Sequence, residues 1–157
     1  MVEPNECVIR SPGFKVQTDL LFACDAVLRG GRTYPVFAAA WIARSGDPYS
    51  DRINSMTKYV VSSTLRDPEW NNTTVISGDP VAAIRRLKEQ PGQDIVQYGF
   101  GQLSCALLEH GLRDELGLWV HPLFVSQATP CRPAVPAVRH RPGRAHRHAR
   151  ADPAGCR

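Results

Sequence analysis

Three short segments of the sequence combine residue types that could hold an anionic group. Each follows an apolar run and brings together glycines, hydroxyls or a cationic side chain. Glycine allows another group to approach the backbone closely, and a helix that begins after such a segment offers unpaired N–H donors and the positive end of its dipole. A phosphate or pyrophosphate suits that chemistry. These segments, called the three junctions below, are Gly30-Gly31-Arg32-Thr33, Ser62-Ser63-Thr64 and Tyr98-Gly99-Phe100-Gly101-Gln102-Leu103.

Each junction also has an interpretation that needs no ligand. Gly99 and Gly101 can form a tight strand-to-helix turn, and Ser104 stands where a complete dinucleotide-binding fingerprint has its third glycine. The hydroxyls of residues 62–64 can hold a sugar 2′-phosphate, but they can equally cap a turn. Arg32 can be an exposed side chain on a glycine turn. The three junctions are more persuasive together than any one of them alone.

The elements around the junctions predict that all three lie along one edge of a sheet. Periodicity and end signals predict helices over residues 14–24, 34–41, 80–90 and 102–110, with a shorter helical piece within 47–56. Strands are predicted over residues 26–28, 58–62, 73–76, 94–98 and 115–125. This alternation indicates an α/β fold with a mostly parallel sheet flanked by helices. Ligands of such sheets bind at the carboxyl ends of the strands, and every junction follows a strand.

Three single residues are expected to define the ends of helices. Thr33 and Asp79 precede predicted helices and have the side-chain oxygens that usually cap them. Gly111 follows the last predicted helix, where glycine commonly adopts the left-handed conformation that ends a helix.

Candidates for direct catalysis are few. Tyr34, Phe37 and Trp41 share one face of a predicted helix, which favours core packing over a wall that stacks on a substrate. Asp25 is a candidate proton donor only through its position near the start of a strand, and the end of a helix is the favoured place for it. The catalytic residues are therefore unknown at this point.

The chain divides into two parts of different composition. Residues 1–125 carry 12 Lys and Arg against 14 Asp and Glu, whereas residues 126–157 carry 7 Arg against one Asp. The first part is long enough for a globular domain, while the second is rich in Arg, Pro and Ala and is expected to be a disordered tail. Such a tail could bind nucleic acid. It has no aromatic side chain to stack on bases, and a tail without a selected role is the favoured interpretation.

The sequence contains no signal for a membrane or for secretion. It lacks a run of about 18 apolar residues, and its N-terminus has no basic stretch followed by an apolar one. The 5 cysteines are scattered without a Cys-x-x-Cys pair, which indicates reduced thiols rather than a disulfide framework or a zinc site. The histidines form no metal-binding pattern. We therefore expect a cytoplasmic protein with no metal and no membrane partner.

The junctions and their surroundings also resemble a known family. Residues 26–41 read AVLRGGRTYPVFAAAW and resemble the motif ALLLGRxTYEGFAAAW of the dihydrofolate-reductase-like family. More narrowly, the chain resembles the C-terminal reductase domain of the bacterial bifunctional riboflavin deaminase-reductase and its stand-alone relatives. The likeness continues, in order, through residues 51–62, 70–76, 98–103, 112–115 and 121–122, and so covers roughly residues 13–124.

This resemblance implies an NADPH-dependent oxidoreductase. The activity would be like that of 5-amino-6-(5-phosphoribosylamino)uracil reductase in riboflavin biosynthesis, or like that of dihydrofolate reductase, with hydride passing to a pteridine or ribosylaminopyrimidine-type substrate. In relatives the three junctions hold the phosphates of the cofactor, and relatives are often dimers, so a homodimer is one expectation. The predicted cofactor-binding residues are Gly30, Arg32, Thr33, Ser62, Ser63, Thr64, Gly99, Gly101, Gln102 and Leu103.

The chain departs from the family pattern in three respects. Gly31 stands where the family has Arg, and Ser63 stands where relatives often carry a basic residue. The choice between NADPH and NADH therefore stays open. Relatives also have a strand before this region and further strands after a His-Pro pair. We therefore predict a reductase-like α/β domain over residues 1–125 that lacks its N-terminal strand and its last strands, followed by the tail over 126–157. The alternatives are an inactive truncated or frameshifted fragment and a nucleic-acid binder acting through the tail.

Overall fold

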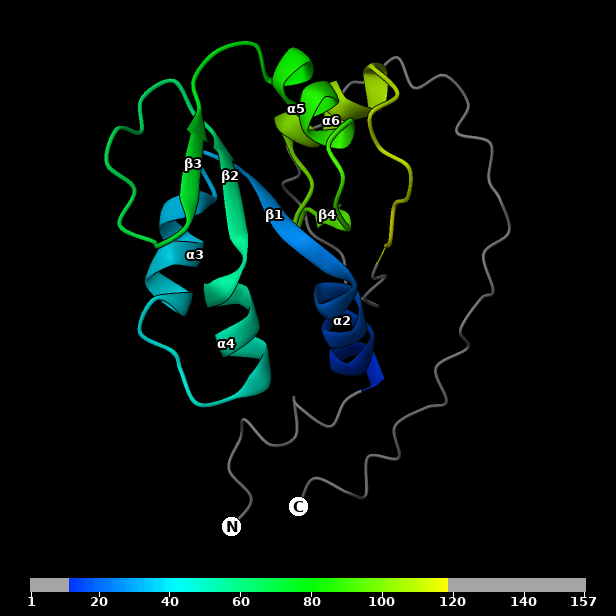
Figure 1. Ribbon diagram of the computed structural model, residues 1–157. Helices are drawn as coiled ribbons and strands as arrows, with labels where there is room; N and C mark the ends of the chain where they lie inside the picture. The colour runs from blue at the N-terminus through cyan, green and yellow to red at the C-terminus, as the bar shows by residue number, and fades with distance from the viewer. Residues whose placement is uncertain (1–11, 119–157) are drawn as a thin grey trace, which may run out of the picture.

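The computed structural model describes residues 12–118, which form a parallel sheet between two layers of helices (Figure 1). The strands of this part lie in the order β3-β2-β1-β4, and every neighbouring pair is parallel. They are β1 (Cys24–Gly30), β2 (Thr57–Val61), β3 (Thr73–Ile76) and β4 (Asp94–Val96). The helices are α2 (Pro12–Ala23), α3 (Tyr34–Trp41), α4 (Pro48–Ser55), α5 (Pro80–Lys88) and α6 (Gln102–Glu109). The predicted α/β fold with a mostly parallel sheet is confirmed.

Two apolar layers cover the two faces of the sheet. Neighbouring residues of a strand point to opposite faces, so Val27 of β1 enters one layer and Leu28 enters the other. The first layer joins the sheet to α2, α3 and α4 through Leu21, Cys24, Val27, Tyr34, Ala38, Tyr49, Ile53, Met56, Val60, Trp70 and Val96. The second joins it to α5 and α6 through Leu28, Ile84 and Leu107, with Tyr59, Val61, Ile95, Leu103 and Leu112 packed around them. Helices α5 and α6 lie close together in Figure 1, apart from α2, α3 and α4.

The order of the strands creates a change of winding direction between β1 and β4. The chain runs outward from β1 to β2 and β3, and then returns to place β4 against the other side of β1. Helix α3 follows β1 in the first layer, whereas α6 follows β4 in the second. The carboxyl ends of β1 and β4 therefore define a topological switch point, which is where open α/β sheets bind their ligands.

Two of the three residues predicted to define helix ends, Asp79 and Gly111, are confirmed. The Asp79 carboxylate caps α5 by accepting the N–H of Val81 at 2.9 Å, and Gly111 ends α6 with a φ of +64°. Thr33 differs from its prediction, because its hydroxyl donates to the carbonyl of Gly30 at 2.9 Å and makes no capping bond to α3. The prediction of a cap at Thr33 is therefore wrong, although α3 begins where it was expected.

The last predicted strand is not formed in the part of it that the structure describes, residues 115–118. The segment before it is held instead by side-chain contacts. Lys88 of α5 forms an ion pair with Asp114, and the guanidinium of Arg113 donates to the side-chain carbonyl of Gln97 after β4. The remainder of that prediction, residues 119–125, and the predicted tail over 126–157 lie outside the described residues.

Three further observations apply to residues 12–118. No helix there is both long enough and apolar enough to cross a membrane, and no group of three or more His, Cys, Asp or Glu side chains could hold a metal ion. Cys24 is a free, buried thiol. Cys105 is disulfide-bonded, so the expectation of reduced thiols is wrong for Cys105.

Candidate functional site

All three junctions lie along the carboxyl edge of the sheet. Residues 30–33 follow β1, residues 62–64 follow β2, and residues 98–103 come shortly after β4. Because β1 lies between β2 and β4, the first junction is the central one. Most of the predicted cofactor-binding residues are exposed, so the junctions form an open surface; the exposed ones are Arg32, Thr33, Ser63, Thr64, Gly99, Gly101 and Gln102.

The first two junctions are in direct contact. The N–H of Gly31 donates to the carbonyl of Val61 at 2.8 Å. A Cβ atom at position 31 would lie 2.8 Å from Oγ and 2.9 Å from Cβ of Ser62, whereas a Cβ at Gly30 would meet nothing within 4 Å. The backbone at position 31 thus lies too close to Ser62 for a residue with a side chain. Glycine fits this position, whereas the arginine of the family motif does not.

The second junction is shaped by its own serine. The Ser62 hydroxyl accepts the backbone N–H groups of Thr64 at 3.3 Å and Leu65 at 3.1 Å. The Ser62 hydroxyl therefore caps a turn, which is one of the two interpretations of this junction. Ser63 and Thr64 are exposed, so their side chains are the ones that could reach a ligand here.

The third junction is a glycine turn that is stabilised by the side chain of Ser104. Gly99 has a φ of +86°, which favours glycine. The buried Ser104 hydroxyl donates to the carbonyl of Gly99 at 3.5 Å and accepts the N–H of Gly101 at 3.4 Å, so it links the two glycines. Leu103 packs into the second apolar layer. Its side chain is therefore structural, and only its main-chain N–H could serve a ligand.

The helices differ in how their N-termini are satisfied, and the difference singles out the switch point. Helix α5 is capped by Asp79. Helix α4 is capped by Asp47, whose pKa is lowered by hydrogen bonds from Ser50. Helices α3 and α6, which follow β1 and β4, have no side-chain cap. Since the first-turn N–H groups of a helix have no partner inside it, these two helices leave donors and a positive dipole end for an anion.

Arg29, the penultimate residue of β1, is a charged residue at this edge that was not among the predicted site residues. Its side chain is 2% exposed, and its Nε, Nη1 and Nη2 atoms have no hydrogen-bond partner among the described residues. The guanidinium carbon lies 3.2 Å from the ring centroid of Phe37 and 5.6 Å from that of Tyr98. The alternation of β1 could have located it, because Arg29 is two residues from the buried Val27 and shares its face.

The aromatic residues of α3 follow the core interpretation. Tyr34 is buried, and its hydroxyl accepts the backbone N–H of Trp70 at 3.0 Å. Phe37 and Trp41 are partly buried against the first apolar layer. Only Phe37 has a second contact relevant to the site, because its ring covers Arg29.

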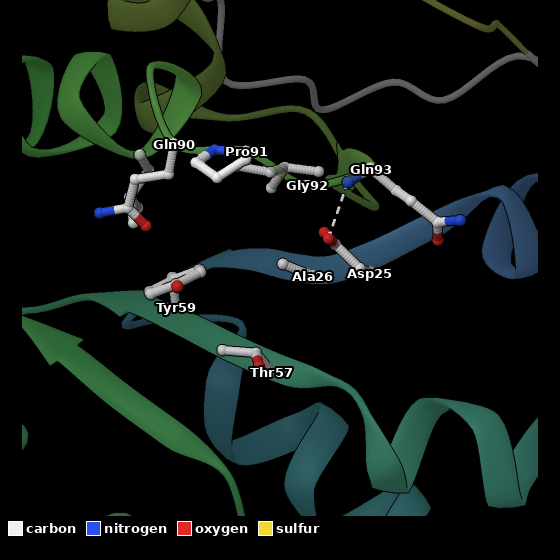
Figure 2. Close-up of a pocket in the computed structure, with 10 residues that line it drawn as sticks. Asp25, Ala26, Thr57, Tyr59, Gln90, Pro91, Gly92 and Gln93 are labelled. Atoms are coloured by element: carbon white, nitrogen blue, oxygen red, sulfur yellow. Dashed lines mark hydrogen bonds between the residues drawn. The ribbon is translucent and has the colours of Figure 1, made fainter.

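A cavity of about 170 Å³ lies at the opposite end of the strands (Figure 2). The Asp25 carboxylate points into it and accepts the backbone N–H of Gln93 at 2.8 Å, the bond drawn in Figure 2. Asp25 is the second residue of β1 rather than the end of a helix. Since this end of the sheet is opposite to the three junctions, Asp25 is not positioned to donate a proton at the candidate site. The cavity is lined by Asp25, Ala26, Thr57, Tyr59, Leu87, Gln90, Pro91, Gly92, Gln93 and Ile95.

Comparison with known proteins decides the family. Residues 7–138 match the family model of the RibD C-terminal domain. The chain belongs to the RibD C-terminal domain family. This match includes all three junctions and confirms the resemblance to the reductase domain of the riboflavin deaminase-reductase. At this level the chain is a reductase-like domain related to riboflavin biosynthesis.

A curated relative of this RibD C-terminal domain has no described activity. The chain is 29% identical over 118 residues to the uncharacterized protein YyaP of Bacillus subtilis (strain 168). The alignment covers 72% of this chain and 62% of YyaP. The chain therefore spans less than two thirds of the length of this relative.

Proposed function

We propose that this chain is an NADPH-dependent reductase that acts on a pteridine or ribosylaminopyrimidine-type substrate. The observation that carries the proposal is the pair of helices without side-chain caps, α3 and α6, on either side of the switch point between β1 and β4. A nicotinamide cofactor contains a pyrophosphate, which such helix ends bind. Membership of the RibD C-terminal domain family supports the reaction class.

Each junction has its own part in holding the cofactor. The main-chain N–H groups of Gly99–Leu103 and of the first turn of α3 would hold the pyrophosphate, with the Arg32 charge beside them. The N–H groups of Gly31 and Thr33 do not take part, because they already donate to the carbonyls of Val61 and Gly30. The exposed hydroxyls of Ser63 and Thr64 would meet the 2′-phosphate that distinguishes NADPH from NADH, on a turn that Ser62 shapes. The bound cofactor supplies the hydride, and the protein binds and orients it.

The setting of the enzyme belongs to the same proposal. We place it in the cytoplasm, with a small heterocyclic substrate, without a nucleic-acid or membrane partner, and as a homodimer. Light scattering coupled to size-exclusion chromatography tests the dimer, and a monomer at micromolar concentration would remove that part alone.

A titration of NADPH followed by its fluorescence tests the cofactor site, with NADH alongside. Gly101→Asp and Gly101→Asn are matched variants, because both side chains can cap α6 and only Asp adds a negative charge. The backbone at Gly101 is extended, and a Cβ there would meet nothing within 4 Å. We expect Gly101→Asp to bind NADPH roughly tenfold more weakly than Gly101→Asn, since its carboxylate repels the pyrophosphate.

Raising the salt concentration should reduce the difference between the two variants. The proposal fails if the wild-type chain does not bind NADPH at high micromolar concentration. It also fails if Asp and Asn at position 101 bind the cofactor equally well. Preference for NADPH over NADH would support a role for Ser63 and Thr64, and equal binding would remove that role.

A further inference from the structure

The Arg29 side chain is a cation without a counter-charge in the part of the chain that the structure describes. It takes part in neither of the ion pairs found among residues 12–118, which join Lys15 to Asp19 and Lys88 to Asp114. Burial lowers the pKa of Arg29 to about 10, so the guanidinium is still protonated at neutral pH. Burial also raises the pKa of Tyr98, so this phenol stays neutral and offers no negative charge.

An arrangement of this kind is costly for the folded protein. A buried charge without a partner strongly destabilises the folded state, and buried polar atoms without hydrogen bonds are rare enough to require an explanation. Here all three guanidinium nitrogens are buried and unpaired. The aromatic rings compensate only in part, because a cation–π contact contributes less than the burial of an unpaired charge costs.

No hydrogen bond occupies the N–H edge of the guanidinium, although that edge is covered from solvent. The Phe37 ring lies close enough to be stacked on its face, and the N–H donors of a guanidinium radiate in the plane of the group. Phe37 follows the first junction and Tyr98 begins the third, so the two rings come from the two sides of the switch point. Since Arg29 is itself buried and both rings are only half-buried, the inference requires that a ring moves aside when an anion binds.

We propose that Arg29 recognises a phosphate-type oxyanion at the switch point between β1 and β4. The planar fork of arginine matches such an oxyanion in a bidentate manner. The contact between Gly31 and Ser62 excludes a cationic side chain at position 31, and Arg29 supplies the charge from within the first layer instead. This inference rests on the proposed function only for the source of the oxyanion, which is either the cofactor or a phosphorylated substrate.

The test is the thermal shift produced by three probes at matched ionic strength: NADPH, ribose 5-phosphate and inorganic pyrophosphate. It compares the wild-type chain with Arg29→Leu and Arg29→Gln, which remove the charge. Arg86→Leu is the control, because Arg86 is exposed on α5 in the other layer. We expect Arg29→Leu to melt at a higher temperature than the wild type without a probe. We also expect at least one phosphate probe to bind both Arg29 variants at least tenfold more weakly than it binds the wild type and Arg86→Leu.

The probe that loses its effect identifies the source of the oxyanion. If the Arg29 variants lose the thermal shift with NADPH, the oxyanion belongs to the cofactor. If they lose the shift with ribose 5-phosphate, it belongs to the substrate. Equal shifts in the wild type and the Arg29 variants overturn the inference, as does a wild type that no phosphate probe stabilises. Failure of both Arg29 variants to fold would show a purely structural role and overturn it as well. NADPH binding that does not depend on Arg29 would overturn this inference for the cofactor and leave the proposed reductase standing.

Discussion

Single residues at the carboxyl edge are constrained by the space around them. Gly31 and Gly30 are neighbours in the sequence, but only Gly31 faces a side chain at a distance that a Cβ atom cannot keep. The nearest atoms are Oγ and Cβ of Ser62 and the carbonyl oxygen of Val61. Rotation of the hydroxyl alone cannot relieve the contact, because the serine Cβ and the carbonyl are fixed to the backbone. The two positions therefore form a matched pair for mutation.

Gly31→Ala should destabilise the fold by about 1–3 kcal/mol, the usual cost of overpacking. It should also weaken NADPH binding, because it displaces the first junction from the second. Gly30→Ala should change the free energy of unfolding by less than about 1 kcal/mol. Urea denaturation checks both values. The double variant Gly31→Ala with Ser62→Gly should recover part of the loss, and the absence of any recovery would contradict the contact.

Lys58 is a second buried cation, but unlike Arg29 it is fully provided with partners. Its side chain is 1% exposed. The ammonium donates to the carbonyls of Asn54 and Met56 at 2.8 Å each and of Asn71 at 3.2 Å, and it lies 4.7 Å from the centroid of the Trp70 ring. It therefore joins the end of α4, the start of β2 and the loop before β3.

Burial lowers the pKa of Lys58 from 10.5 to about 8, which gives stability a definite pH dependence. Between these two values the unfolded chain binds more protons than the folded one, so the Lys58 contribution to the free energy of unfolding rises with pH. Lys58→Met lacks this contribution. Its free energy of unfolding should also be lower by about 1–3 kcal/mol, because the carbonyls that accept from Lys58 become unpaired. Denaturation at pH 7 to 10 should show the wild type gaining stability relative to Lys58→Met. A constant difference would contradict the lowered pKa.

At the scale of whole elements, the caps divide the helices into two kinds. Helices α4 and α5 have their N-terminal donors satisfied by aspartates, and the fold gains stability from both bonds. Helices α3 and α6 have no such cap, although both follow strands whose carboxyl ends meet at the switch point. The aspartate-capped helix ends and the uncapped ends proposed to bind the ligand thus belong to separate helices.

Asp79→Ala should cost about 1 kcal/mol, the typical value for the loss of an N-cap, because two N-terminal donors of α5 lose their acceptor. NADPH affinity should change much less than in Gly101→Asp, since α5 follows β3 at the edge of the described sheet. Thermal unfolding and the fluorescence titration measure the two effects on the same sample. A large loss of affinity without a loss of stability would place Asp79 in the site rather than in the fold.

Much of the element order could be predicted from the sequence, because local signals determine it. Asp79 before a proline and Gly111 after an apolar helix mark ends that depend on a few neighbouring residues. Arg29 and Lys58 could not be assigned their roles in this way, since their partners come from elements distant in the chain. The strand predicted over 115–125 was wrong over 115–118 for a related reason: a strand needs a neighbour to pair with, and an apolar pattern does not supply one.

At the scale of the molecule, the two apolar layers share the strands between them. Val27 and Leu28 are adjacent in β1 and pack into different layers, so neither layer can lose its packing without disturbing the strand that supports the other. Small domains of this kind unfold in one cooperative step. Helices on opposite faces should therefore melt together.

Ile84→Ala tests this coupling, because Ile84 of α5 is 3% exposed and belongs to the second layer. This substitution should lower the free energy of unfolding by about 2–5 kcal/mol. The fluorescence of Trp70, which is buried in the first layer, should shift its unfolding midpoint by the same amount as the far-UV circular dichroism. Replacing Trp41 and Trp119 by Phe isolates that signal. Two separate midpoints would show that the layers unfold independently.

The glycine that begins α6 has a practical consequence for anyone who engineers this protein. A screen that ranks variants by heat resistance alone would favour an acidic residue at Gly101, because it completes an end that the natural chain leaves incomplete. Under the proposed function, the most heat-resistant variants from such a screen would be those with the weakest affinity for the coenzyme.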